Sequence, residues 1–292
     1  MIENHPMRGL ALMSASLMVF STLDAATKHL SALYPIPFII WARYTVHCLA
    51  MLAVLGPSMG GRLFATRRFG LVLVRSLCLL ATTGCGVTAF QTMPLAETTA
   101  IIFIAPVMVA LMAGPMLGER VGWPHWVAMG LGFGGTLLIA HPGGSVSPIG
   151  VMLSIGAAIF FSFYQILTRR LSMTENSWAM VFHSALAGSL IMGVFMPVYW
   201  PENLPPWQDL LMISAIGAFA ATAHSIQTRA FRYAPASLLA PMGYSQLIWA
   251  TLMGWLIFDH LPDGYALAGI ALIILGGLGV IRAERRKTAS PA

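Results

Sequence analysis

The sequence has little charge. Only 9% of its 292 residues are Asp, Glu, Lys or Arg, whereas a soluble domain carries about 25%. Hydrophobic residues make up 58%. The shortage of charge excludes an ordinary soluble domain, and the high hydrophobicity excludes an intrinsically disordered chain. The sequence therefore predicts an all-α integral membrane protein.

Cysteine is also scarce, since only Cys48, Cys78 and Cys85 occur, each within an apolar stretch. An odd number of embedded cysteines without CxxC or Cys/His spacing argues against a disulfide framework and a zinc site, so we predict no metal and no cofactor. No HExxH, GxSxG, DDxxD or Walker A motif is present, which argues against an enzyme and against an ATP-driven motor. We expect membrane lipid and a small-molecule substrate as partners, but no nucleic acid and no ATPase subunit. We also expect the monomer to be functional.

A helix needs about 20 apolar residues to cross the hydrocarbon core. The chain contains about ten such segments: 8–29, 36–56, 69–90, 95–116, 123–140, 149–168, 177–199, 208–229, 236–258 and 263–281. The connections between them are too short to hold a soluble domain. Segment 8–29 is too long for a signal peptide and carries Asp24 and Lys28, so we interpret it as a retained helix.

The basic residues indicate the orientation of these segments. With a cytoplasmic N-terminus, 13 of the 16 basic residues fall at the cytoplasmic ends and connections: Arg8, Arg62, Arg67, Arg68, Arg120, Arg169, Arg170, Arg229, Arg232, Arg282, Arg285, Arg286 and Lys287. The five connections on the other side contain no Lys or Arg. The positive-inside rule therefore predicts a multi-pass protein of the cell inner membrane with both termini cytoplasmic.

The chain contains a weak internal repeat. Residues 21–31 align with residues 162–172 at an offset of 141, which we call the repeat offset, and Pro94 aligns with Pro235 in the same way. Each copy, 8–140 and 149–281, holds five spans, and an odd number inverts the second copy in the membrane. Inverted repeats are typical of secondary transporters. Pro106 and Pro241 fall inside the fourth and ninth spans, where they predict helix interruptions, either beside a binding site or as simple kinks.

Several motifs point to one family. They are Pro94-Leu95-Ala96-Glu97-Thr98, Ala105-Pro106, Leu117-Gly118-Glu119-Arg120 and the glycine-rich stretch 130–135. With them the chain resembles the EamA repeats of the drug/metabolite transporter superfamily, in its ten-helix exporter branch. The resemblance implies alternating access through a central cavity lined mainly by spans other than the fifth and tenth. It implies amino acids as substrates, aromatic or broad-range, with a nucleobase, riboflavin, S-adenosylmethionine or a cationic drug as the alternative.

Few ionisable residues are embedded. Asp24, Glu97 and Arg43 are expected at one depth, with Arg43 about 10 Å from the end of its span. One hypothesis is that Arg43 and one of the two acids grip a zwitterion. Another is that Asp24 pairs with Lys28 or Arg43 and locks two helices. A third gives Glu97, Asp24 or His47 a coupling proton.

Aromatic and amide residues near the midplane complete the candidate substrate site. They either contact a planar substrate or pack between helices, and they are Tyr44, Phe90, Phe103, Tyr164, Gln165, Tyr244 and Gln246. We expect Arg75 to reach the membrane interface or to pair with Glu119, and not to bind substrate.

Overall fold

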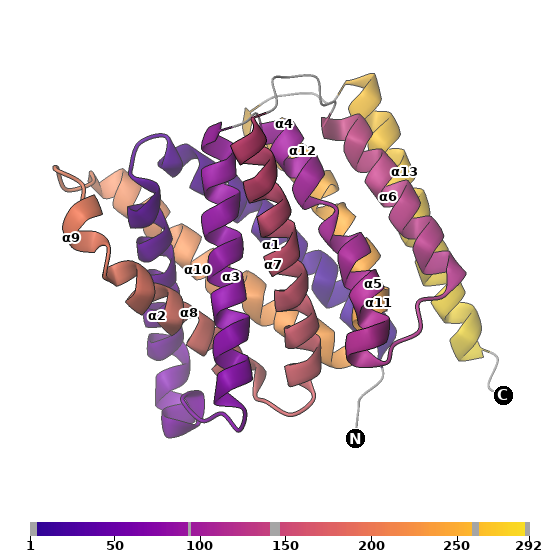
Figure 1. The fold of residues 1–292 in the computed structure, drawn as a ribbon, viewed down its shortest axis with the longest axis horizontal. Helices are drawn as coiled ribbons and strands as arrows, with labels where there is room; N and C mark the ends of the chain where they lie inside the picture. The colour runs from indigo at the N-terminus through magenta and orange to yellow at the C-terminus, as the bar shows by residue number, and fades with distance from the viewer. Residues whose placement is uncertain (1–4, 93–94, 141–146, 259–262, 290–292) are drawn as a thin grey trace.

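The computed structural model describes residues 5–92, 95–140, 147–258 and 263–289, and all regular structure in these ranges is helical (Figure 1). The first half contains α1 (Pro6–Ser31), α2 (Ile36–Met59), the short η1 (Gly60–Leu63), α3 (Phe69–Thr92), α4 (Leu95–Ile102), α5 (Ala105–Leu117) and α6 (Trp123–Ala140). The second half contains α7 (Pro148–Ser172), α8 (Ser177–Gly193), α9 (Met196–Tyr199), α10 (Trp207–Tyr233), α11 (Ala236–Leu239), η2 (Ala240–Tyr244), α12 (Ser245–Phe258) and α13 (Gly264–Ala289).

The helices are long and apolar enough for a membrane. Seven helical segments of the described chain meet the length and hydropathy of a membrane span. Together with α6, α8 and the broken segment from α11 to α12 they make ten passes, and both termini lie at the same end of the bundle (Figure 1). We call this end the terminal side. Large apolar side chains face outward, such as Val54 (73% exposed) and Leu190 (64% exposed), as lipid contact requires.

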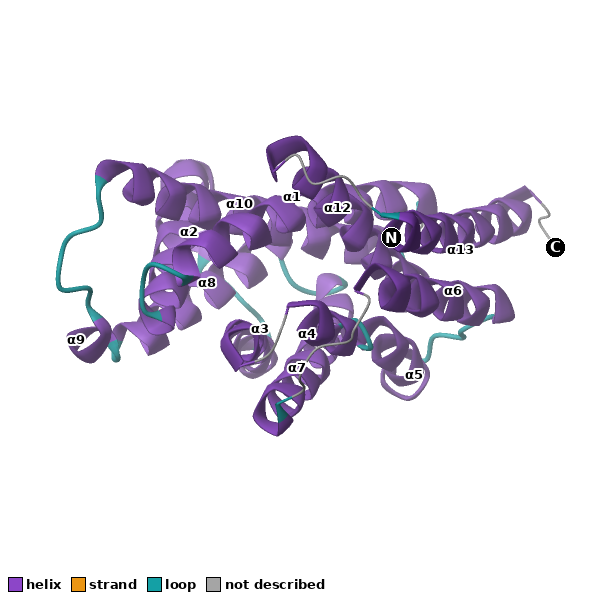
Figure 2. Cartoon of the chain, turned by 90° about the horizontal axis from the view of Figure 1, so that it is seen from above, coloured by secondary structure: helices purple, strands orange, loops and turns teal. Residues whose placement is uncertain are grey.

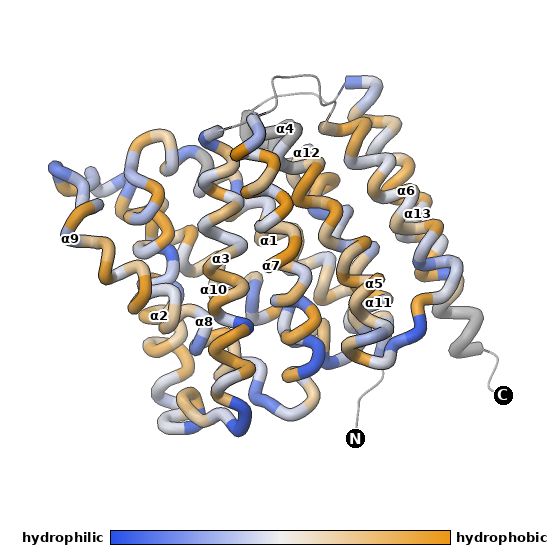
Figure 3. Tube along the Cα trace, in the orientation of Figure 1, coloured by the Kyte–Doolittle hydropathy of each residue, from blue (hydrophilic) through white to orange (hydrophobic). Residues whose placement is uncertain are grey.

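The most hydrophilic segments gather at the ends of the bundle, above all at the terminal side, while the helix walls are mainly apolar (Figure 3). This distribution matches the predicted integral membrane fold, because polar connections remain in water while apolar helix surfaces meet lipid.

The two halves pack symmetrically. Helix α1 of the first half packs along α10 of the second, and α7 of the second packs along α3 of the first. The two contacts are equivalent, because interchanging the two halves of the chain converts one contact into the other. Helices α6 and α13 pack against each other at one edge of the bundle, where both also contact η2 (Figure 2). The pairing is that expected of two inverted five-helix repeats.

One hydrogen bond occurs in both halves at equivalent positions. The Ser21 hydroxyl donates to the Gln246 carbonyl oxygen at 3.0 Å, and the Ser162 hydroxyl donates to the Ala105 carbonyl oxygen at 3.3 Å. Ser21 and Ser162 are separated by the repeat offset, and so are Ala105 and Gln246. Each bond joins a repeat's first helix to the broken helix of the other repeat. The duplication seen in the sequence is therefore present in the contacts.

The fourth and ninth passes are interrupted. Helix α4 ends at Ile102, and α5 begins at Ala105 with Pro106 in its first turn. The ninth pass changes from α11 to the 3₁₀ segment η2, which contains Pro241, and then to α12. Proline cannot donate a backbone hydrogen bond, so it fits the start of each new segment.

Glycine allows α6 and α13 to approach closely. A Cβ atom on Gly135 would lie 2.6 Å from the carbonyl oxygen of Gly269, and a Cβ on Gly269 would lie 2.5 Å from that of Gly135. No larger residue fits either position without moving the backbone. Close contact between small residues is the usual way in which helices associate in lipid.

Candidate functional site

Polar side chains from both repeats meet between α1, α2 and α12. The Gln246 side-chain amide donates to an Asp24 carboxylate oxygen at 2.8 Å, which links the first repeat to the second. Arg43 on α2 attracts Asp24 electrostatically, but the described residues contain no direct ion pair between them. Asp24 is exposed while Arg43 is buried. The two opposite charges are therefore near each other without being neutralised by direct contact.

Two histidines lie deeper in the bundle. His47, one turn from Arg43 on α2, has its ring parallel to that of His224 on α10, with ring centroids 6.1 Å apart. The ring of Phe20 on α1 contacts His224 edge-on at a centroid distance of 4.8 Å. Both histidines are almost fully buried. The three helices thus place aromatic and imidazole rings directly below the charged pair.

Arg75 and Tyr164 lie next to these histidines. The Tyr164 hydroxyl is 3.1 Å from His224 Nδ1 and accepts a hydrogen bond of 3.0 Å from Arg75. The Arg75 guanidinium also lies over the Tyr164 ring, 4.5 Å from its centroid. Arg75 is fully buried and donates as well to Thr168 Oγ1 (2.7 Å), Ser184 Oγ (2.8 Å), the Met180 carbonyl oxygen (3.0 Å) and Thr228 Oγ1 (3.2 Å).

The predicted surroundings of Arg75 were wrong. This residue neither reaches the interface nor pairs with Glu119, because hydroxyls and a carbonyl oxygen from α7, α8 and α10 surround its guanidinium inside the bundle. Glu119 instead pairs with Arg169. A buried arginine in a membrane helix is costly, and such residues usually have a functional role.

Several buried polar atoms in this region have no hydrogen-bond partner among the residues that the structure describes. They are Arg43 Nε, His47 Nε2, His224 Nε2 and both amide atoms of Gln227. A buried polar group without a partner costs free energy, so a native structure keeps such groups where a ligand or water satisfies them. We define the polar cluster as Asp24, Arg43, His47, Arg75, Tyr164, His224, Gln227 and Gln246. It provides donors, acceptors and both signs of charge.

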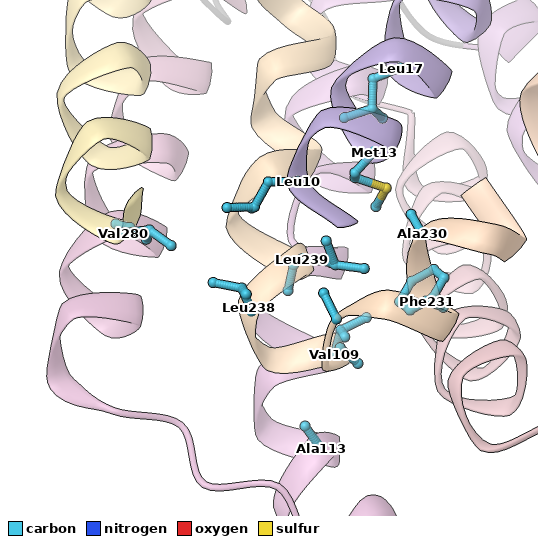
Figure 4. Packing of buried hydrophobic residues seen from close by; sticks show 14 of the residues in the cluster. Leu10, Met13, Leu17, Val109, Ala113, Ala230, Phe231, Leu238, Leu239 and Val280 are labelled. Carbon is cyan, nitrogen blue, oxygen red and sulfur yellow. The ribbon is translucent and has the colours of Figure 1, made fainter. Parts of the chain in front are cut away.

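The terminal side is closed by an apolar cluster. Leu10, Met13 and Leu17 of α1 pack with Phe231 of α10 and Leu239 of α11, together with residues of α5 and α13 (Figure 4). On the opposite side Asp24 remains exposed. The conformation is therefore sealed below the polar cluster, toward the terminal side.

An ion pair strengthens this closure. Gly118 takes the left-handed conformation (φ 69°) that ends α5, so the following Glu119 turns toward α7 and α11. Its carboxylate accepts from Arg169 Nε at 2.9 Å and from the backbone N–H groups of Ala236 and Ser237 at 3.2 and 3.0 Å. Arg169 also donates to the Phe231 carbonyl oxygen. These contacts tie both repeats together at the terminal side.

The structure brings five of the predicted site residues together: Asp24, Arg43, His47, Tyr164 and Gln246. Tyr44 lies beside this group and bonds to Thr83 Oγ1 at 3.1 Å. Phe103 and Tyr244, which occupy equivalent positions in the two repeats, form a ring pair at the helix breaks with a centroid distance of 6.0 Å.

Other predicted residues lie elsewhere. Phe90 is exposed in the last turn of α3, and Gln165 is buried on α7. Glu97 belongs to α4, but its side chain is outside the described residues. The prolines Pro106 and Pro241 lie at the helix breaks, as described above.

Sequence reasoning did not include Arg75, His224 and Gln227 in the candidate site. Their sequence signal is weak, because each is a single polar residue in an apolar span. A stronger signal was available on α7, where Tyr164 and Thr168 are one helical turn apart and therefore share a helix face. Both contact Arg75.

An apolar cavity of about 380 Å³ lies apart from the polar cluster, between α2, α3, α7 and α8. Its lining contains a single polar side chain, Thr88, and includes Ile40, Ala81 and Met192. It shares no residue with the polar cluster, so it is not the same site.

The fold and the polar cluster define a multi-pass membrane protein with two inverted repeats and a polar centre between them. The EamA-like transporter family matches residues 7–141 and residues 148–282, which is nearly the whole chain. The protein belongs to this family.

Its relatives carry different substrates. The chain is 26% identical to a riboflavin transporter of Vibrio cholerae over 98% of its own length and 97% of that protein. It is 23% identical to the pseudopaline exporter CntI of Pseudomonas aeruginosa over 95% of its length and 97% of the exporter. One solved crystal structure superposes with a TM-score of 0.84 at 19% identity, covering 95% of this chain and 98% of that one, which shows the shared fold. The protein is thus a transporter of small metabolites.

Proposed function

We propose that the protein is a secondary transporter that carries amino acids across the cell inner membrane by alternating access, with both termini cytoplasmic. The substrate lies in the polar cluster between the repeats. In the conformation described above, the cluster is reached from the side of Asp24 and closed on the terminal side by the apolar cluster and the Glu119–Arg169 pair. Release on the other side requires these contacts to open.

One observation carries this proposal: Asp24 and Arg43 interact electrostatically, but the described residues contain no ion pair between them. Arg43 Nε is buried and has no hydrogen-bond partner within the described ranges. A zwitterion satisfies both residues, because its carboxylate accepts from Arg43 and its ammonium donates to Asp24. Gln246 holds the Asp24 carboxylate in place from the second repeat. This arrangement fits an amino acid better than a substrate with a single charge.

A second candidate is a larger planar metabolite such as a flavin. The riboflavin transporter matches almost the whole chain, and the aromatic residues Phe103 and Tyr244 stand at the helix breaks. Flat ring systems stack on such side chains. In this case Asp24 and Arg43 would join helices and would not bind the charged groups of a substrate.

Uptake into proteoliposomes tests the two candidates. Purified protein is given labelled amino acids and labelled riboflavin, with and without an imposed pH gradient. We expect saturable uptake of several amino acids. Uptake of riboflavin with no amino-acid uptake would replace the proposal by the second candidate, and the response to the gradient would show whether protons are coupled.

A further inference from the structure

We propose that His224 and Gln227 on α10 form a second subsite that takes an additional carboxylate of the substrate, with the positive charge of Arg75 behind it. This inference rests on the proposed function, because it narrows the substrates to amino acids with an acidic side chain.

The charge of Arg75 supports an anionic ligand. Every hydrogen-bond partner of Arg75 in the described chain is a neutral oxygen, and the guanidinium is fully buried. Arg43, one turn from His47 on α2, adds a second buried cation. Asp24 is the nearby acid, but it lies at the exposed edge of the cluster. Buried charge is costly without an opposite charge, so an anion bound here is stabilised by both arginines.

The hydrogen bonds around Tyr164 favour the tautomer of His224 that carries its proton on Nε2. Arg75 donates to the Tyr164 oxygen, so the arginine cannot accept the tyrosine proton. His224 Nδ1, at 3.1 Å, is the acceptor next to that hydroxyl. A neutral His224 that accepts at Nδ1 carries its proton on Nε2, which is buried and unpaired. The chain from Arg75 through Tyr164 therefore makes His224 Nε2 a hydrogen-bond donor.

Gln227 supplies a second donor. It follows His224 by almost one helical turn, so both side chains occupy one face of α10. Gln227 is only 1% exposed, and neither of its side-chain polar atoms has a hydrogen-bond partner in the described part of the chain. Thr228, the next residue, accepts from Arg75 and anchors this turn of α10 beside the cation. Two N–H donors and a nearby positive charge match the two oxygens of a carboxylate.

The subsite is separated from the zwitterion-binding pair. Asp24 lies one turn after Phe20 on α1, and the Phe20 ring covers His224. An amino acid bound by Asp24 and Arg43 thus reaches His224 with its side chain once Phe20 moves. Neutral and cationic side chains gain nothing from Arg75, whereas a carboxylate gains a charge-assisted hydrogen bond.

Thermal unfolding in detergent measures this preference through ligand stabilisation. Glutamate and glutamine are the matched probes, because they differ in the charge of one terminal group. Glutarate, which has two carboxylates and no ammonium, is the third probe. We expect the apparent affinity for glutamate to exceed that for glutamine by about tenfold or more, as expected for a hydrogen bond to a charged group.

Tyr164→Phe tests the positioning role of the relay. It preserves the ring over Arg75 but removes the hydroxyl, so we expect the glutamate-to-glutamine ratio to fall toward one while both ligands still bind. His224→Gln retains an N–H donor and should keep part of the preference, whereas His224→Phe should lose it. Arg170→Gln, which removes an exposed arginine on the terminal side, is the control and should leave the ratio unchanged.

The outcomes separate the two proposals. Equal affinity for glutamate and glutamine, with amino acids still transported, overturns the subsite and leaves the proposed function intact. Stabilisation by glutarate in the absence of any amino-acid binding supports the subsite and overturns the amino-acid substrate. A ratio unaffected by Tyr164→Phe in folded protein overturns the relay from Arg75 to His224. No stabilisation by any of the three probes overturns the subsite, while the proposed function is then decided by the uptake of the other amino acids into proteoliposomes.

Discussion

Glu119, which follows the end of α5 in the first repeat, forms an ion pair of 2.9 Å with Arg169 of α7 in the second. The same carboxylate accepts from two backbone N–H groups at the start of α11. One side chain therefore joins three helices where the bundle is closed. Separation of the repeats at the terminal side requires all these contacts to break.

Glu119→Gln should favour the conformation that is open at the terminal side. A hydrogen bond to a charged group contributes about 1.5–3 kcal/mol, so the open population should rise about tenfold or more. The measurement is the rate of maleimide labelling of Ser237→Cys in a chain whose three native cysteines are replaced. Glu202→Gln, an exposed acid on the opposite side, is the control. Equal labelling rates would show that the ion pair does not hold this closure.

Gly135→Ala should destabilise the α6–α13 contact. The added Cβ would meet the Gly269 carbonyl oxygen at 2.6 Å, and overpacking of this kind costs about 1–3 kcal/mol. The neighbouring Gly134 is a matched control, since a Cβ there would have nothing within 4 Å. Thermal unfolding in detergent should show a lower melting temperature for Gly135→Ala than for Gly134→Ala. A melting temperature as high as that of the control would mean that the two helices can separate at little cost.

Tyr34, on the side of the bundle away from the termini, makes the stability of the folded protein depend on pH. Its hydroxyl donates to Asp209, and this bond to a carboxylate raises the Tyr34 pKa from its usual 10 to about 12. The bond thus contributes stability that is complete below pH 10 and disappears as the pH rises toward 12. Wild-type protein should melt above Tyr34→Phe at pH 8, and the two should converge near pH 12. Tyr199→Phe is the control, and a difference that persists at high pH would contradict the assignment.

Arg43→Ala should weaken binding of amino acids. Loss of a charge-assisted hydrogen bond to the substrate carboxylate predicts about a 10- to 100-fold higher apparent KM for uptake. Removing a buried charge can also unfold the helix pair, so folding is checked first by size-exclusion chromatography. Retained uptake with a normal KM would remove Arg43 from the substrate site.

Glu97→Gln tests proton coupling. If Glu97 carries the coupled proton, its amide analogue should transport without any response to an imposed pH gradient, because it cannot release a proton. His47→Ala tests the same role on α2. An unchanged response to the gradient in Glu97→Gln would exclude this residue from coupling.

The arrangement of helices was predictable from the sequence because a membrane imposes simple rules. Apolar length defines the spans, and the odd number of spans in each copy inverts the second. The membrane fold and the family are confirmed. The alignment that placed Ser21 against Ser162 corresponds in the structure to equivalent hydrogen bonds.

The interior contacts were not predictable in the same way. The partners of Arg75 lie on three helices that follow it by 89 to 153 residues in the chain. Nothing in the local sequence distinguishes a buried arginine from one that reaches the interface, since both occur near the end of an apolar span. Glu119 is similar, because Arg169 and the start of α11 approach it only after the repeats pack.

The charged residues of the polar cluster occur in one repeat and not in the other. Asp24 and Arg43 correspond to Gln165 and Ser184 at the repeat offset, although the hydrogen bonds of Ser21 and Ser162 are equivalent in the two copies. A perfectly duplicated chain would present identical affinities to the two compartments. Divergence of a few side chains lets the affinity differ between the two faces, while the gradients across the membrane still determine the net flux. The packing common to both copies thus supplies the scaffold, and the side chains that differ between them supply the chemistry of the site.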